Sequence, residues 1–119
     1  MNIPTDKGKL SPTRPGAVWV GWTTTATREE AEHLGRGLVE EGLAACAQID
    51  GPVTSFFRWE GVTETATEYR LTLKFTKIRA ADIESWLLRH HSYQNPQWVC
   101  VRSAAAAKNY LNWVGATSS

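Results

Sequence analysis

The pattern of hydrophobic and polar positions along the chain predicts strands of two kinds. Residues 17–24 and 98–102 are short, mostly apolar runs, which are typical of buried strands. In residues 69–77 every second side chain is apolar, and this alternation indicates a strand with one buried and one polar face. The chain therefore predicts a sheet with at least one face covered by other elements.

A further stretch of alternating positions predicts a hairpin. Residues 43–50 alternate, Gly51 and Pro52 interrupt the pattern, and the aromatic-rich run 53–60 then resumes it. Residues 62–67 are polar, so we expect them to form a loop before the next strand.

Three segments have the spacing of amphipathic helices. The first begins at a capping box, in which Thr27 and Glu30 are expected to satisfy amide groups of the first turn, and it ends at Gly42. The second ends near a histidine pair, and the third stops at Gly115. The apolar positions of the three helices are Ala31, Leu34, Leu38 and Val39; Ile83, Trp86, Leu87 and His90; and Ala107, Tyr110, Leu111 and Val114.

The order of these elements, β-α-β-β-α-β-α, predicts an α+β fold with an antiparallel sheet. Short hairpins between helical crossovers give the split β-α-β arrangement of a ferredoxin-like sandwich, here with an additional C-terminal helix. In that topology the second and last strands lie at opposite edges, so Cys46 and Cys100 are expected to be too far apart for a disulfide. Both are expected to be free, buried thiols.

Length and composition bound the domain organisation. The chain has 119 residues, of which 42% are hydrophobic, and this is enough for one domain with a real core but too few for two. Residues 1–16 contain several prolines and glycines, so we expect an N-terminal tail followed by a single domain over 17–119.

Charge excludes some classes of partner. The 13 basic and 12 acidic residues are interspersed and give a net charge of +1, which argues against nucleic-acid binding. No segment approaches the roughly 20 apolar residues that span a bilayer, so no membrane association is expected. The tail lacks an apolar signal core, and we therefore expect a cytoplasmic protein.

The sequence contains no recognisable catalytic machinery. His91 and Ser92 are neighbours, but no nucleophile motif surrounds them, so we do not expect an enzyme. His90 and His91 point about 100° apart on a helix, so a metal site here would need ligands from elsewhere in the fold or from another chain.

The aromatic strand indicates self-association. Phe57 and Trp59 share one face and Phe56 lies on the other, so folding of one chain leaves apolar surface uncovered on one side. Pairing of such strands between chains would bury it, and we therefore expect an oligomer.

Several segments together resemble the CutA-type divalent-cation tolerance family. They are LVEEGLAACAQI (38–49), SFFRWEG (55–61), LTLKFTK (71–77), RHHSYQNPQWV (89–99) and NYLNWV (109–114). The resemblance covers nearly the whole chain outside the tail. It implies a ferredoxin-like fold, a homotrimer, a cytoplasmic location and a role in tolerance of copper or other divalent cations, with no established enzymatic activity.

The resemblance also implies site residues. His90 matches a family histidine linked to copper, and Cys46 matches the cysteine of the LAAC strand, so Cu(II) or another divalent cation is the implied metal. Trp59, Lys74 and Tyr93 match positions of the cleft between subunits in this family.

Three positions depart from the family pattern. Trp22 stands where some members have a copper-ligating cysteine, Ser92 replaces a proline, and Gln97 replaces a glutamate. A soft thiolate and a charged carboxylate, both of which favour copper, are thereby absent. An alternative is a PII-like module that holds a small anionic or aromatic effector between Trp59, Lys74, Tyr93 and Gln97. A third is a scaffold for a partner protein, bound through the tail.

Overall fold

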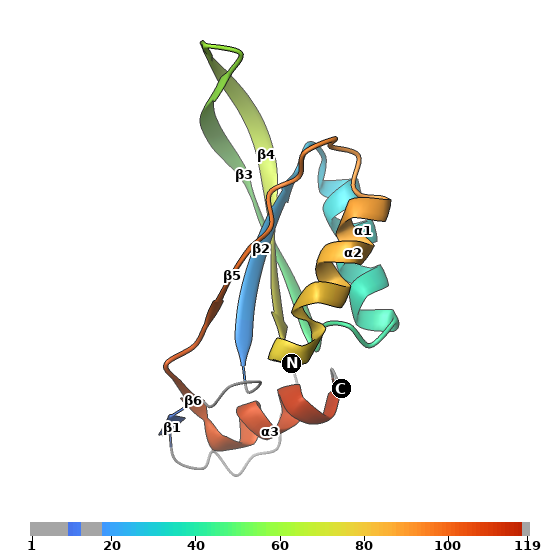
Figure 1. Cartoon of the computed structure of the whole chain (residues 1–119), viewed down its shortest axis with the longest axis vertical. Coiled ribbons are helices and arrows are strands. Elements are labelled where there is room, and N and C mark those ends of the chain that lie inside the picture. The colour runs from blue at the N-terminus through green and yellow to red at the C-terminus, as the bar shows by residue number, and fades with distance from the viewer. Residues whose placement is uncertain (1–9, 13–17, 118–119) are drawn as a thin grey trace.

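A four-stranded antiparallel sheet with two helices on one face forms the body of the chain (Figure 1). The computed structural model describes residues 10–12 and 18–117. Strand order is β3-β4-β2-β5, so the second and last strands of this sheet lie at opposite edges, as predicted. The sheet elements are β2 (Trp19–Thr25), β3 (Cys46–Trp59), β4 (Val62–Phe75) and β5 (Val99–Arg102), and the helices over them are α1 (Arg28–Glu40) and α2 (Ala80–His90), the latter preceded by η1 (Lys77–Arg79). The predicted α+β class is confirmed.

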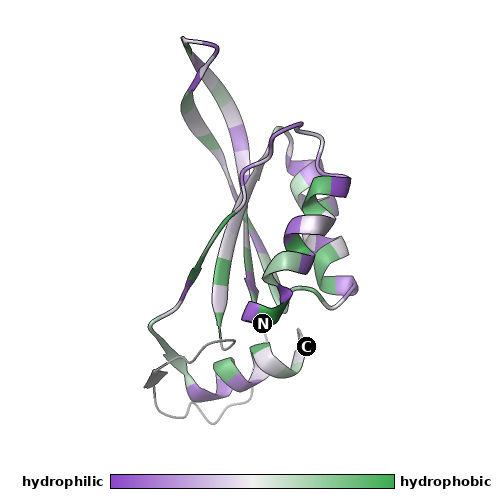
Figure 2. Ribbon diagram, in the orientation of Figure 1, coloured by the Kyte–Doolittle hydropathy of each residue, from purple (hydrophilic) through white to green (hydrophobic). Residues whose placement is uncertain are grey.

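The core lies between the sheet and α1 and α2. Leu71, Leu73 and Phe75 of β4 are fully buried, which confirms the inward face predicted from the alternation. Leu34 of α1 and Ile83 of α2 are also fully buried against them, and Figure 2 shows hydrophobic and hydrophilic residues alternating around both helices. Full burial of such side chains stabilises the fold by about 1.5–3 kcal/mol each.

The start of α1 differs from the predicted capping box in one respect. The Thr27 hydroxyl accepts a hydrogen bond from the Glu30 amide at 3.1 Å, as expected for an N-cap. The Glu30 carboxylate, however, binds Ser92, far along the chain, at the end of α2. At the other end of the helix, Gly42 has a φ of 73°, the left-handed conformation expected after a last turn.

The predicted hairpin was placed wrongly. Gly51 and Pro52 lie inside β3, at a bulge between Asp50 and Val53, and the chain reverses instead at Glu60 and Gly61. Both of these have positive φ, as in the tight turns that suit twisted hairpins. Proline is tolerated in β3 because this strand lies at the sheet edge and is bulged there.

Residues 62–67 are strand and not loop. They pair with 54–59 of β3, and this arm of the hairpin projects beyond the helices (Figure 1). Within the described residues, no helix covers either face of the arm. Its strands therefore need no apolar face, and a prediction that relies on apolar alternation misses them.

Two short strands and a helix lie at the opposite end of the sheet. Within the predicted tail, β1 (Leu10–Pro12) pairs with β6 (Ala105–Ala107), where the sequence predicted no strand. The remaining tail residues, 1–9 and 13–16, lie outside the described residues. The C-terminal helix α3 (Lys108–Thr117) continues past Gly115, where it was expected to stop, and Val114 is fully buried. No helix in the described ranges is both long and apolar enough to cross a membrane.

Candidate functional site

His90 is the last residue of α2 and His91 is its C-cap, and the two histidines have different roles. The His90 ring is exposed, stacks on Trp86 with 3.9 Å between ring centroids, and places Nδ1 2.8 Å from the Trp86 carbonyl oxygen. A ring nitrogen facing a carbonyl oxygen donates its proton, so Nε2 of neutral His90 keeps its lone pair. Metal-binding histidines are held by a hydrogen bond of this kind on their other nitrogen.

His91 is a structural residue. Its side chain is fully buried, Nε2 lies 2.9 Å from the Thr24 carbonyl oxygen, and Nδ1 accepts the Tyr93 amide at 3.0 Å. Neither nitrogen is available to a ligand, because the first donates its proton and the second uses its lone pair. His91 therefore ties the end of α2 to β2 and cannot join His90 at a metal.

Ser92 anchors the segment that follows. Its amide donates to one Glu30 carboxylate oxygen at 2.7 Å and its hydroxyl donates to the other at 2.8 Å. A proline at this position has neither donor, so the departure of Ser92 from the family pattern has a structural consequence. It links α1 to the segment after α2 through a two-point, charge-assisted contact.

Tyr93 reaches from this segment to the base of the long hairpin. Its hydroxyl donates to Oε2 of Glu68 at 2.8 Å, and Glu68 is only 9% exposed. Burial, followed by the hydrogen bond to Glu68 and the charges of Glu68 and Glu30, raises the pKa of Tyr93 to about 12. The Tyr93 phenol therefore stays protonated across the neutral range and keeps the Glu68 carboxylate in place.

This contact predicts a loss of stability at alkaline pH. The Tyr93 pKa rises from 10.0 to about 12 on folding, so between these values the unfolded chain has lost a proton that the folded chain keeps. The free energy of unfolding should fall as pH rises through this window, and the contribution is fully present below it. In Tyr93→Phe, urea titrations across this range should show a shallower fall; an unchanged slope would refute the assignment.

Two cavities flank Tyr93. One, of about 540 Å³, lies between the hairpin and the segment after α2, and Glu68, Tyr93 and Gln97 contribute to its lining. The other, of about 490 Å³, is lined by Trp59, Tyr93 and neighbouring residues of both segments. Three of the four predicted cleft residues, Trp59, Tyr93 and Gln97, are thus brought to one region.

Lys74, the fourth, lies at the other end of the sheet. Its Nζ donates to Oε1 of Gln48 at 2.8 Å and lies 5.8 Å from the centre of the Tyr110 ring. Twelve positions of β4 separate it from Val62, the partner of Trp59. At about 3.3 Å per residue this is about 40 Å, so within one chain Lys74 cannot share a ligand with Trp59.

Cys46 pairs with Lys74 in the sheet and is buried. It lies beside Tyr110, whose pKa is raised to about 12 by burial and, secondarily, by the Cys46 thiol. Cys46 and Cys100 are both free, and burial, followed by the charge of Glu84, raises the pKa of the Cys100 thiol. Over residues 10–12 and 18–117, no three His, Cys, Asp or Glu side chains are grouped to hold a metal ion.

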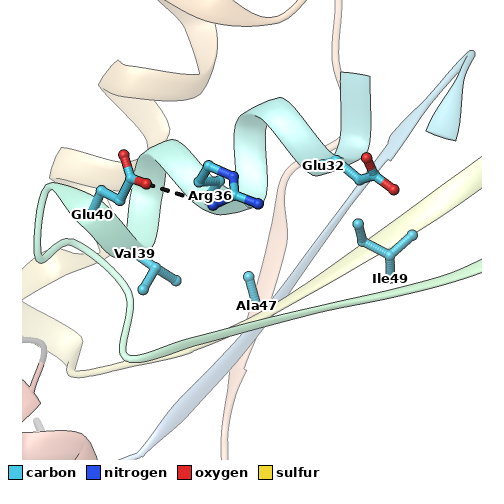
Figure 3. A pocket seen from close by; sticks show the side chains of 7 residues that line it. Glu32, Arg36, Val39, Glu40, Ala47 and Ile49 are labelled. Carbon is cyan, nitrogen blue, oxygen red and sulfur yellow. Dashed lines mark ion pairs between the residues drawn. The ribbon is translucent and has the colours of Figure 1, made fainter. Parts of the chain in front are cut away.

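A third cavity lies between α1 and the sheet edge. It measures about 370 Å³, and Figure 3 shows Ala47 and Ile49 of β3 below Arg36 and Glu40 of α1. The Arg36 guanidinium and the Glu40 carboxylate form an exposed ion pair of 3.9 Å. Such pairs are worth at most about 1 kcal/mol. Glu32, which also lines the cavity, is paired with Arg28 at 3.1 Å, so each charged residue that lines this groove already has a partner of opposite charge.

Glu30 and Glu68 are the site residues that sequence reasoning missed. The sequence pattern predicts Glu30 as part of a capping box. Glu68 has the strand parity of Arg70 and Lys74, which indicates a solvent-facing position. The neighbouring sequence does not indicate the role of either residue, because each role depends on a hydrogen bond from a residue more than twenty positions away.

Comparison with known proteins agrees with this architecture. Residues 19–117 match the model of the CutA1 divalent ion tolerance protein family. A divalent-cation tolerance protein CutA of Archaeoglobus fulgidus is 34% identical over 96 residues, which cover 81% of this chain and 93% of that protein.

Solved structures agree as well. CutA from Synechococcus elongatus superimposes with a TM-score of 0.89 at 31% identity, covering 97% of this chain and all of that one. A periplasmic divalent cation tolerance protein CutA from Archaeoglobus fulgidus gives a TM-score of 0.83 at 32% identity, covering 86% of this chain and 99% of that one. The family model spans most of the chain, and these relatives share its length and fold. The chain therefore belongs to the CutA1 divalent ion tolerance protein family.

Proposed function

We propose that this protein binds a divalent cation, Cu(II) first among candidates, and that His90 is the ligand each chain supplies. The observation that carries the proposal is the orientation of the imidazole. Nδ1 is held by the Trp86 carbonyl, and the exposed ring leaves Nε2 free to coordinate. Imidazole nitrogen is a suitable donor for Cu(II).

One imidazole does not hold an ion tightly, so the remaining ligands must come from another chain or from solvent. Cys46, the second predicted ligand, is buried and points to the sheet face away from α2, so it cannot complete a site with His90 of the same chain. A site shared between copies of the chain is the arrangement that this geometry supports. The proposal includes no catalytic step.

Calorimetric titration of the tag-free protein with Cu(II), with the oligomeric mass measured on the same sample, tests the proposal. We expect saturable binding with a simple ratio per chain, abolished in His90→Ala. His33→Ala removes another exposed histidine, on α1, and is expected to leave the isotherm unchanged. If His90→Ala does not alter the isotherm, His90 is not a copper ligand. A trimer without saturable copper binding would show that this member keeps the fold and lacks the metal site.

A homotrimer is the assembly that we propose. Opposite the helices, the sheet presents Val20, Trp22, Val99 and Val101 on adjacent strands. Val99 is 54% exposed and Val101 46% exposed, and an uncovered apolar sheet face of this kind marks an association surface. Phe56, 72% exposed on the hairpin, adds apolar area that a second chain would cover.

We further propose a cytoplasmic location. Two free thiols in one small chain are compatible with a reducing compartment. The relative from Archaeoglobus fulgidus with a solved structure is described as periplasmic, so cell fractionation with an antibody against this protein is the deciding measurement.

Small-effector binding is a second candidate function, supported by the two cavities that meet at Tyr93. The relatives reported above carry CutA names, which does not favour assignment to PII-like signalling proteins. The cavities nevertheless offer a ligand site that does not depend on His90.

A further inference from the structure

The indole of Trp86 is held by α1 at two points. Its ring lies so close to Gly37 that an added Cβ would be 2.9 Å from Cη2. Its Nε1 donates a hydrogen bond to Oε2 of Glu41, the residue at the C-cap of α1. Trp86 is 4% exposed, so its N–H needs an acceptor within the protein, and Glu41 provides it.

Trp86 in turn holds His90 in two ways. The planes of the two rings lie 18° apart, so the imidazole rests flat on the indole. The backbone carbonyl of Trp86 faces Nδ1 of the same imidazole. The carbonyl therefore selects Nε2 as the free nitrogen, and the indole sets the plane in which the lone pair of Nε2 points.

These contacts lie within one chain and in its helix layer. The trimer contact proposed above, which includes Val101, lies on the opposite face of the sheet. A ligand atom from a second chain would approach Nε2 of His90, and none of the contacts between Glu41, Trp86 and His90 uses that nitrogen. The arrangement of the three residues therefore does not depend on which surfaces a second chain covers.

The hydrogen bond, and not the charge, is the important property of Glu41. Glu41 is exposed, and water and salt screen the charge of an exposed carboxylate. A hydrogen bond from a buried indole is directional, and its loss would leave the N–H without an acceptor. The indole would then be free to turn toward water, and the imidazole stacked on it would lose its fixed plane.

We propose that Glu41 is a positioning residue for the metal site. By accepting the N–H of Trp86 it holds the indole on which His90 is stacked, and it thereby sets the direction in which Nε2 presents its lone pair. The proposal rests on the proposed function, copper binding at His90, and adds a residue that acts on the ligand without touching the ion.

Nuclear magnetic resonance of the metal-free protein tests the position of the ring. The indole ring current shifts the Cδ2 and Cε1 proton resonances of His90 upfield while the two rings are stacked. In Glu41→Ala we expect these resonances to move downfield, toward those of His33, which is exposed on α1. Glu41→Gln keeps a carbonyl acceptor for the indole and should leave them in place. His33→Ala and His90→Ala assign the signals.

Titration with Cu(II) then measures the consequence for metal binding. Replacing a residue that orients a metal ligand costs roughly 10–100-fold in affinity, and we expect the lower end, about tenfold, for Glu41→Ala. Glu41→Gln should bind Cu(II) like the native protein. Glu40→Ala, the matched control, removes the neighbouring carboxylate, which pairs with Arg36 on the surface, and should change neither the resonances nor the isotherm. Thermal unfolding shows whether each variant is folded.

A double-mutant cycle shows whether Glu41 acts through Trp86. Trp86→Phe keeps an aromatic ring but has no N–H, so in that background Glu41→Ala should cause no further loss of Cu(II) affinity. An equal loss in both backgrounds, or unchanged His90 resonances in folded Glu41→Ala, would overturn the inference.

The two measurements also separate this inference from the proposed function. If the native protein binds Cu(II) and folded Glu41→Ala binds it equally well, the positioning role fails and copper binding at His90 stands. If the native protein binds no Cu(II), the proposed function fails and the role of Glu41 at a metal fails with it. The resonances of the metal-free protein then still show whether Glu41 holds the imidazole.

Discussion

Replacing Trp86 with alanine is expected to lower the free energy of unfolding by about 3–5 kcal/mol, the range for large aromatic truncations in cores. Trp86 is 4% exposed and lies in the main core cluster beneath α1. Its ring approaches Gly37 so closely that an added Cβ would lie 2.8 Å from Cζ2. Its indole N–H donates to the Glu41 carboxylate, so the substitution removes packing and a hydrogen bond together.

Urea denaturation at one fixed protein concentration measures this effect, because association would otherwise shift the midpoint. Leu88→Ala is the matched control: Leu88 is on the same helix and 61% exposed, so its loss should cost less than about 0.5 kcal/mol. A loss below about 1 kcal/mol in Trp86→Ala would contradict the packing described for α1 and α2. Because the His90 ring rests on Trp86, Trp86→Ala should also weaken Cu(II) binding.

The body of the fold was predictable because its signals are periodic and its faces are buried. Leu71, Leu73 and Phe75 alternate with polar residues, and burial under two helices requires that alternation. The same reasoning placed α1 correctly, since Thr27 caps the helix and Gly42 follows it in a left-handed conformation. Opposite edge positions for β3 and β5 then followed from connectivity alone.

The long hairpin was not predictable from the same signals. Gly51 and Pro52 are strong turn residues, yet the structure accommodates them at a bulge in an edge strand. The actual turn at Glu60 and Gly61 contains only one residue with intrinsic preference for positive φ. Without a helix against the arm, no core selects which residues of 62–67 face inward, so periodicity carries no information there.

Some residues of the candidate site were likewise predictable from the sequence and others were not. His90 was identified because a family motif marks it, and its orientation could come only from the contact with Trp86. His91 has the same residue type and the opposite role, since its burial and both of its nitrogen contacts depend on β2 and Tyr93. The role of Glu68 becomes visible only through the hydrogen bond that it accepts from Tyr93, because its strand parity indicates a solvent-facing position.

Introducing a charge at Val101 is expected to convert the proposed trimer to monomers. Val101 lies on the edge strand β5 beside Val20 of β2, on the uncovered sheet face, and is 46% exposed in the single chain. In a trimer that buries this face, Val101→Asp would place three carboxylates in an apolar contact without partners. Burying an unpaired carboxylate costs several kcal/mol per chain, and each 1.4 kcal/mol lowers the association constant about tenfold.

Light scattering after size-exclusion chromatography gives the mass of the native protein and of the variant, and this measurement tests the prediction. Leu88→Asp introduces the same charge at an exposed aliphatic residue of α2, on the other layer, and should leave the mass unchanged. Dissociation by Val101→Asp alone would identify the open sheet face as the contact. If Val101→Asp remains a trimer, the hairpin bearing Phe56 must carry the association instead. A monomeric native protein would refute the assembly, and with it a copper site completed by a second chain.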